Sequence, residues 1–81
     1  MKIEILGPGC RDSDNLCRSA HWAVRKMGIE AEIVRVENAR EIIRRGVLMT
    51  PALAIDERVV SVGRVLQPAD IQAILESSTL V

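Results

Sequence analysis

Of the two cysteines in this sequence, Cys10 occupies the position better suited to nucleophilic chemistry. It follows Gly7-Pro8-Gly9, where a short alternating segment gives way to a helical pattern. A thiol at the start of a helix lies beside unpaired N–H groups and the positive end of the helix dipole, and both favour the thiolate. The neighbouring Arg11 favours it too, whereas Asp12 and Asp14 oppose it. Because the thiolate is the reactive species in disulfide exchange, we predict that Cys10 is catalytic. The alternative role, a small buried core residue, suits a polar glycine-rich loop poorly.

The second cysteine, Cys17, is badly placed to form a disulfide with Cys10. In a helix that starts near Cys10, Cys17 lies about 10.5 Å further along the axis. A disulfide tolerates Cα separations only up to about 7 Å. Cys17 also falls within an apolar stripe, so we expect it in the core. Zinc binding by Cys10, Cys17 and His21 would use only three ligands at a spacing that matches no structural zinc pattern, so no metal site is expected.

The composition of the chain narrows the classes of function. Its 81 residues hold 11 Lys and Arg against 11 Asp and Glu, so no net charge draws the chain to nucleic acids or acidic membranes. Trp22 is the single aromatic residue, which argues against nucleic-acid binding by base stacking. No apolar run approaches the ~20 residues that span a bilayer, and Glu4 comes too early for a signal peptide. We therefore expect a cytoplasmic protein with reduced thiols and no nucleic-acid or membrane partner.

The first part of the chain alternates between strand-like and helical patterns. Lys2–Leu6 alternates polar and apolar residues and predicts a strand. A helix is expected over Ser13–Met27, with Ser13 as a candidate capping residue and Gly28 as the residue that ends it. Ala31–Val36 predicts a second strand. The apolar stripe of the helix comprises Leu16, Cys17, Ala20, Ala23, Val24 and Met27.

A short second helix is predicted in the middle of the chain. Asn38 is a good N-cap, the helical pattern extends to Arg45, and Gly46 ends it. We expect Ile42 and Ile43 to face the core. The arginines of this segment are expected to form a solvated surface: Arg40, Arg44 and Arg45.

The last part of the chain predicts a hairpin followed by a helix. Ala52–Ile55 and Val59–Val62 are β-rich runs separated by Asp56-Glu57-Arg58. Pro68 fits the first position of a final helix. Residues 76–81 form a tail without a clear prediction. The apolar face of the final helix comprises Ile71, Ile74 and Leu75.

The resulting order of elements is β-α-β-α-β-β-α, and the chain is expected to form one domain over residues 1–81. The first two strands are joined by a long helix, so they must be parallel with a right-handed crossover, whereas the last two strands are antiparallel. A four-stranded mixed sheet with helices on both faces would bury every apolar stripe. We therefore predict an α/β fold of this kind.

Three segments of the sequence resemble the small thioredoxin-like "redox-active disulfide" proteins of bacteria and archaea, and the similarity extends over nearly the whole chain. They are Gly7-Pro8-Gly9-Cys10, Met27-Gly28-Ile29 and Gly46-Val47-Leu48-Met49-Thr50-Pro51-Ala52-Leu53. The resemblance implies a thioredoxin-like fold, with Cys-x-x-Cys at the helix N-terminus and a cis-proline beside it. On this basis Cys10 matches the nucleophilic cysteine and Pro51 the cis-proline. Thr50 and Pro51 would then bind a substrate strand through backbone groups, as in β-augmentation. Sequence alone would otherwise favour a trans bond before a proline that starts an edge strand.

The sequence departs from that family pattern at one position. Where the pattern has its second cysteine, this chain has Ser13. A serine hydroxyl can hydrogen-bond a thiolate, but it cannot form a disulfide. The resemblance therefore implies a single-cysteine mechanism, as in monothiol glutaredoxins, or an inactive relative. A serine engineered to trap mixed disulfides would give the same sequence, and Ser13 could equally be only a helix cap.

Two functions from different classes follow. The first is a thiol–disulfide oxidoreductase in which Cys10 forms mixed disulfides with a protein or a low-molecular-weight thiol partner, with help from Ser13 and without a cofactor. The second is a non-catalytic thioredoxin-fold binding or scaffold module, with iron–sulfur cluster binding of the monothiol-glutaredoxin kind as a variant. Trp22 lies opposite the apolar stripe of its helix, so we expect it to be exposed and a candidate anchor for a homodimer or another partner.

Overall fold

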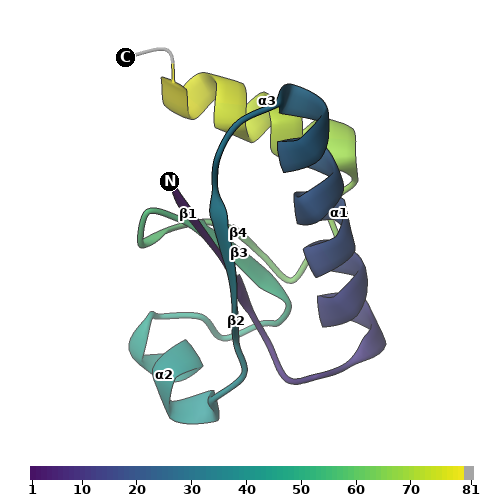
Figure 1. The fold of residues 1–81 in the computed structure, drawn as a ribbon. Helices are drawn as coiled ribbons and strands as arrows, with labels where there is room; N and C mark the ends of the chain where they lie inside the picture. The colour runs from purple at the N-terminus through teal and green to yellow at the C-terminus, as the bar shows by residue number, and fades with distance from the viewer. Residues whose placement is uncertain (80–81) are drawn as a thin grey trace.

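The computed structural model of the protein describes residues 1–79, and its elements occur in the predicted order (Figure 1). The four strands are β1 (Lys2–Leu6), β2 (Glu32–Val36), β3 (Ala52–Ile55) and β4 (Arg58–Val62). The three helices are α1 (Arg11–Met27), α2 (Ala39–Arg44) and α3 (Pro68–Thr79). None of the helices in the described part of the chain is long and apolar enough to cross a membrane.

The strands form one mixed sheet in the order β2-β1-β3-β4. β1 runs parallel to β2, with Lys2 opposite Glu32, and antiparallel to β3, with Ile3 opposite Ile55. β4 pairs antiparallel with β3. The turn between these two strands is Asp56-Glu57, and both residues have positive φ, as the tight primed turns of hairpins require. These pairings confirm the predicted sheet.

Helices cover both faces of this sheet, as predicted, because alternate residues of the central strands point to opposite sides (Figure 1). On one face, Ile3 and Ile5 of β1 pack with α1 and α3. On the other, Leu6 of β1 packs with α2 and the segment that follows it. The buried residues of the larger core are Ile3, Ile5, Leu16, Ala20, Ala23, Leu53, Ile55, Leu66, Ile71 and Leu75. Those of the smaller core are Leu6, Ile42, Val47, Ala52 and Ala54.

Two predictions about the α2 side of the molecule are wrong. Ile42 is buried, but Ile43 is 64% exposed, because adjacent residues point about 100° apart on a helix with 3.6 residues per turn. The solvated role expected for Arg45 is also wrong. Its guanidinium forms two hydrogen bonds, of 2.9 and 2.8 Å, with the carboxylate of Glu4. Glu4 lies on β1 and is only 2% exposed, so Arg45 forms an ion pair with a buried carboxylate.

Several element ends also differ from the prediction. The first helix begins at Arg11, so Cys10 is its N-cap and Ser13 lies inside it instead of capping it. The helix ends at Gly28 with a left-handed φ of 66°, as expected. The predicted N-cap of α2 is confirmed, because the Asn38 side chain accepts a hydrogen bond from the backbone N–H of Glu41. The last helix takes up residues 76–79 of the expected tail, and residues 80–81 lie outside the described part.

Candidate active site

The Cys10 thiol is exposed at the junction between the β1 loop and α1. Cys10 has extended backbone angles of φ −116° and ψ 172°, and its carbonyl accepts the first helical hydrogen bond, 2.9 Å from the N atom of Asp14. On the loop side, the Cys10 N–H donates to the carbonyl of Pro8 at 2.7 Å. The Gly-Pro-Gly segment therefore fixes the backbone that presents the thiol at the helix N-terminus.

The pKa of the Cys10 thiol lies below its ordinary value of 9.0, first because the Ser13 hydroxyl hydrogen-bonds the sulfur, with Sγ and Oγ 3.5 Å apart. The backbone N–H groups of Ser13 and Asp12 donate to the sulfur as well and lower its pKa further. The slight burial of the thiol and the negative charge of Asp12 act in the opposite direction but are outweighed. All three donors belong to the first turn of α1, whose unpaired N–H groups favour an anion.

Ser13 is fully buried, and its surroundings bring the predicted site residues together. Gly7 lies against it so closely that a Cβ atom on Gly7 would collide with Ser13 Oγ. The same Cβ would lie 3.5 Å from Thr50 Cβ and 3.6 Å from Pro51 Cα. The Ser13 hydroxyl and the Thr50–Pro51 segment therefore both lie on the side of Gly7 where a Cβ atom would point, and no space is left there for a larger residue. Periodicity in the sequence does not predict this role of Gly7, although the two glycines around Pro8 are a visible signal of close packing.

The Thr50–Pro51 peptide bond is cis and lies in the loop that enters β3. Pro51 is buried, whereas Thr50 is exposed, and the backbone N–H and C=O of Thr50 have no partner within residues 1–79. The Pro51 carbonyl accepts a hydrogen bond of 2.9 Å from the N–H of Gly63, just after β4. Gly63 has a φ of 69°, and Met49 packs against it. The loop therefore holds the unpaired backbone groups of Thr50 close to Gly7.

Cys17 packs against the larger core, as expected, and is partly buried there. It lines a small surface hollow of about 270 Å³ with four charged or titratable side chains: Asp14, Arg18, His21 and Arg35. Arg35 donates to Asp14 at 2.8 Å, which closes one side of the hollow. Both cysteines are free. In the described part of the chain, no group of three or more His, Cys, Asp and Glu side chains is positioned to hold a metal ion.

The fold and this site together define a thioredoxin-like protein: an exposed thiol precedes the first helix, and a cis-proline loop of the neighbouring strand lies close to that helix. The chain belongs to the thioredoxin-domain family, whose model matches residues 1–76. It is 36% identical over 75 residues to a thioredoxin of Methanothermobacter thermautotrophicus, covering 93% of this chain and 97% of that protein. It is 35% identical over 75 residues to a thioredoxin of Methanocaldococcus jannaschii, covering 93% of this chain and 86% of that protein. Family and site support thiol–disulfide exchange as the general chemistry.

Proposed function

We propose that this protein is a thiol–disulfide oxidoreductase that works through Cys10 alone, by mixed disulfides with a protein or a small thiol compound. The observation that carries the proposal is the hydrogen bond between Cys10 Sγ and the buried Ser13 hydroxyl. It gives Cys10 an activated thiolate and fills the neighbouring position with a group that forms no disulfide.

The proposed exchange has three steps. The Cys10 thiolate attacks one sulfur of a partner's disulfide, forms a mixed disulfide with it, and releases the other sulfur as a thiolate that takes a proton from water. A second thiolate then attacks the Cys10 sulfur of the mixed disulfide, which releases the first partner as a thiol. Cys10 is now joined to the second thiol, and a further molecule of the same thiol frees it. The net reaction reduces the partner's disulfide and oxidises two external thiols to a disulfide.

External thiols are needed because the chain itself offers no suitable second thiol. Ser13 lies one helical turn from Cys10, and its hydroxyl is far too weak a nucleophile at neutral pH. Cys17 lies within α1 and about 10.5 Å further along the helix axis than Cys10. The proposal therefore includes a cytoplasmic setting, where small thiols are plentiful and structural disulfides are rare.

Thr50 and Pro51 are the proposed binding site for the partner's chain. The free N–H and C=O of Thr50 offer a pair of backbone hydrogen bonds to an extended segment, in the manner of β-augmentation. Gly7 keeps this segment close to the first turn of α1, where Cys10 is held. A disulfide carried by the bound segment would be presented to Cys10.

The alternative function is a thioredoxin-fold binding module without turnover, including a module that binds an iron–sulfur cluster through Cys10. Such a module needs no activated thiolate. The lowered pKa of Cys10 and the hydrogen bond that causes it therefore favour exchange over scaffolding.

The test is the glutathione-dependent reduction of a small mixed disulfide by three forms of the protein. We expect Cys10→Ser to abolish the protein-catalysed rate and Cys17→Ser to keep it within about twofold of the wild-type rate. Loss of activity in Cys17→Ser, with circular dichroism unchanged, would contradict the single-cysteine mechanism. Absence of any catalysed rate in the wild type would favour the binding module.

A further inference from the structure

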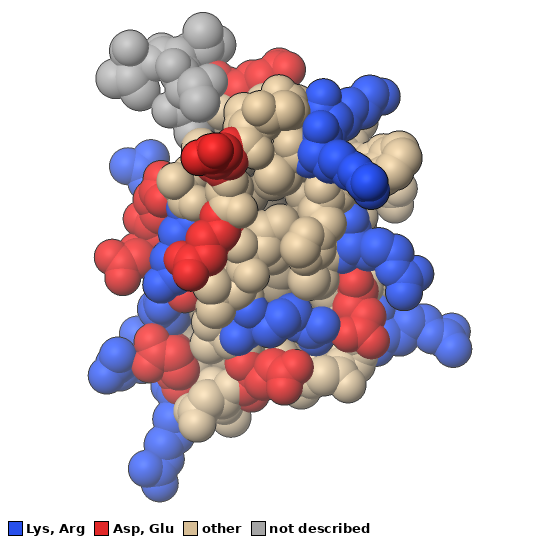
Figure 2. Space-filling view, in the orientation of Figure 1, with Lys and Arg blue, Asp and Glu red and all other residues tan. Residues whose placement is uncertain are grey.

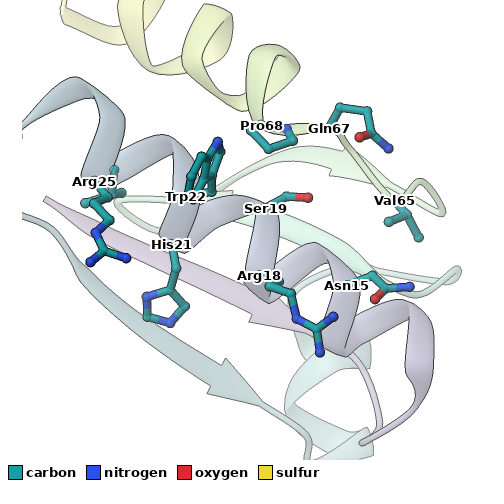
Figure 3. Close-up of a pocket in the computed structure, with 10 residues that line it drawn as sticks. Asn15, Arg18, Ser19, His21, Trp22, Arg25, Val65, Gln67 and Pro68 are labelled. Atoms are coloured by element: carbon teal, nitrogen blue, oxygen red, sulfur yellow. The ribbon is translucent and has the colours of Figure 1, made fainter.

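A second surface, away from the Cys10 thiol, combines an exposed aromatic ring with a groove. The groove has a volume of about 910 Å³ and lies between the outer side of α1 and the segment that leads into α3. Trp22 is 55% exposed and projects from α1 toward Pro68, and Val65 lines the same wall as Pro68 (Figure 3). The exposure predicted for Trp22 is thereby confirmed. More than half of this large apolar residue is exposed, and it lines open space.

The charges around this groove have one sign. Its ten lining residues include Arg18, Arg25 and His21 but no Asp or Glu, although the chain as a whole has equal numbers of acidic and basic residues. Neither Arg18 nor Arg25 forms an ion pair within residues 1–79, whereas Arg35 and Arg45 do. The face of the molecule in Figure 2 shows several basic side chains along the edge formed by α1, with an acidic side chain among them in its lower half.

The spacing of these residues defines what would fit. Arg18 and Arg25 are seven residues apart, so they lie about 10.5 Å apart along the axis and on nearly the same side of α1. Trp22 stands between them, four residues after Arg18 and three before Arg25. A partner helix with carboxylates at positions i and i+7 and an aliphatic residue at i+3 or i+4 repeats this spacing. Its carboxylates would reach the two guanidinium groups while its aliphatic side chain covers the indole.

We propose that the groove beside Trp22 binds an acidic amphipathic helix of a partner protein, in the helix-in-groove mode. Small molecules are usually enclosed on most sides by their sites, whereas Trp22 is more than half exposed here. The proposal adds a docking site to the proposed function, but binding at the groove requires no thiol chemistry. It can therefore fail or succeed independently of Cys10.

A second copy of this chain fits the groove less well. In a two-fold dimer centred on Trp22, Arg18 of each copy would lie against Arg25 of the other, and like charges would repel. The described helices offer no carboxylate pair seven residues apart either. Their acidic residues are Asp12 and Asp14 in α1, Glu41 in α2, and Asp70 and Glu76 in α3.

The experiment uses the Cys10→Ser protein and a 16-residue helical peptide of alanine and glutamine that carries two glutamates seven residues apart around a leucine pair. A fluorescein label reports binding by anisotropy, and the emission of Trp22, the single aromatic residue, reports contact at the groove. We expect the glutamate peptide to bind at least tenfold more tightly than its glutamine version, with an affinity that falls as salt is added.

Variants of the groove complete the test. Arg18→Glu with Arg25→Glu should weaken binding of the glutamate peptide at least tenfold and should create binding of the matching lysine peptide. Arg18→Gln with Arg25→Gln serves if the reversed charges disturb folding. The control Arg40→Glu changes an exposed arginine of α2 and should alter affinity by less than twofold.

The inference is overturned if the glutamate and glutamine peptides bind equally, or if the groove variants and Arg40→Glu have the same effect. It is also overturned if sedimentation shows dimers of the free protein that disappear in Trp22→Ala, because a second copy would then occupy the groove.

Discussion

At the scale of single residues, Ser13 controls the reactivity of Cys10 from a fully buried position. Its hydroxyl lies 3.5 Å from the sulfur and is the leading cause of the lowered pKa of Cys10. Both the hydroxyl and the backbone N–H groups of the first turn stabilise the thiolate, not the thiol. The reactivity of Cys10 at neutral pH therefore depends on a residue that a reagent in solution does not touch.

This dependence predicts the pH profile of alkylation. The rate should follow the thiolate fraction, so it falls as the pH drops through the pKa of Cys10, and the midpoint should lie below 9.0. Ser13→Ala removes the leading cause of the shift, so its midpoint should move up toward the value of an ordinary thiol. Iodoacetamide labelling followed by mass spectrometry, in a Cys17→Ala background, measures both. An unchanged midpoint in Ser13→Ala would show that the backbone donors alone set the pKa.

Gly7 provides the second prediction at this scale. Its φ is not in the left-handed region, so the backbone conformation does not require a glycine here. Glycine is required because a Cβ atom would collide with Ser13 Oγ. Gly7→Ala would place a methyl group onto Ser13 Oγ between α1 and the Thr50–Pro51 loop, and we expect a loss of about 1–3 kcal/mol in the free energy of unfolding.

Gly9→Ala is the matched control, because its Cβ would lie 3.4 Å from Glu37 Oε1, an ordinary contact with a flexible side chain. Urea denaturation should show Gly9→Ala near wild type. Ser13→Ala should partly restore the stability of Gly7→Ala, because it removes the atom that the new methyl group meets. Equal losses in Gly7→Ala and Gly9→Ala would mean that the site is not closely packed.

At the scale of elements, the ion pair between Glu4 and Arg45 ties β1 to the C-terminal end of α2. The hydrogen bonds from Arg45 hold the pKa of the Glu4 carboxyl below its ordinary value although burial opposes them. Arg45 also donates to Glu41 at 3.1 Å, within its own helix. A buried carboxylate thus determines where the short helix α2 packs.

Arg45→Met should cost about 3–5 kcal/mol of unfolding free energy at pH 7, because it leaves the buried Glu4 charge without its partner. Glu4→Leu combined with Arg45→Met should recover most of that loss. Arg44→Met is the control, since Arg44 pairs with Glu41 on the surface and is 78% exposed at its side chain, and it should change stability by less than about 1 kcal/mol. Urea denaturation measures all three.

The pH dependence of this effect has a defined sign. A carboxyl whose folded pKa is lowered contributes stability above its unfolded pKa, and that contribution is lost as the pH falls through the folded pKa. The difference in unfolding free energy between wild type and Arg45→Met should therefore be largest at neutral pH and should decrease in acid. An advantage that stays constant into strong acid would assign the stability to the packing of the Arg45 side chain instead.

At the scale of the whole molecule, the sequence predicts the order of elements and the sheet, because strand and helix periodicities alternate clearly along the chain. It also locates Cys10, since the thiol stands at the boundary between two such patterns. The sequence did not predict the contacts on the second covered face of the sheet, the face that packs against α2. Alternation alone does not reveal that Glu4 points into a covered face, or that Arg45 folds back to meet it. The burial of Ser13 in α1 likewise depends on its contact with Gly7, which follows β1.

The whole fold also determines how the two cysteines relate. α1 holds Cys10 at its N-cap and Cys17 two turns further along, where Cys17 packs against the core formed with β1 and α3. A bond between them would require this helix to open and its core contacts to separate. The continuous, packed helix therefore enforces the single-cysteine mechanism that we propose.

Mass spectrometry of a single stoichiometric turnover tests this claim most directly. The reduced protein is mixed with an equal amount of a peptide disulfide, without any added thiol, and the products are quenched with acid and separated. We predict that wild type accumulates a mixed disulfide between Cys10 and half of the peptide. The Ser13→Cys variant should instead release both peptide halves and end with an internal disulfide between Cys10 and the introduced cysteine. Release of both halves by wild type, together with an internal Cys10–Cys17 disulfide, would contradict the account.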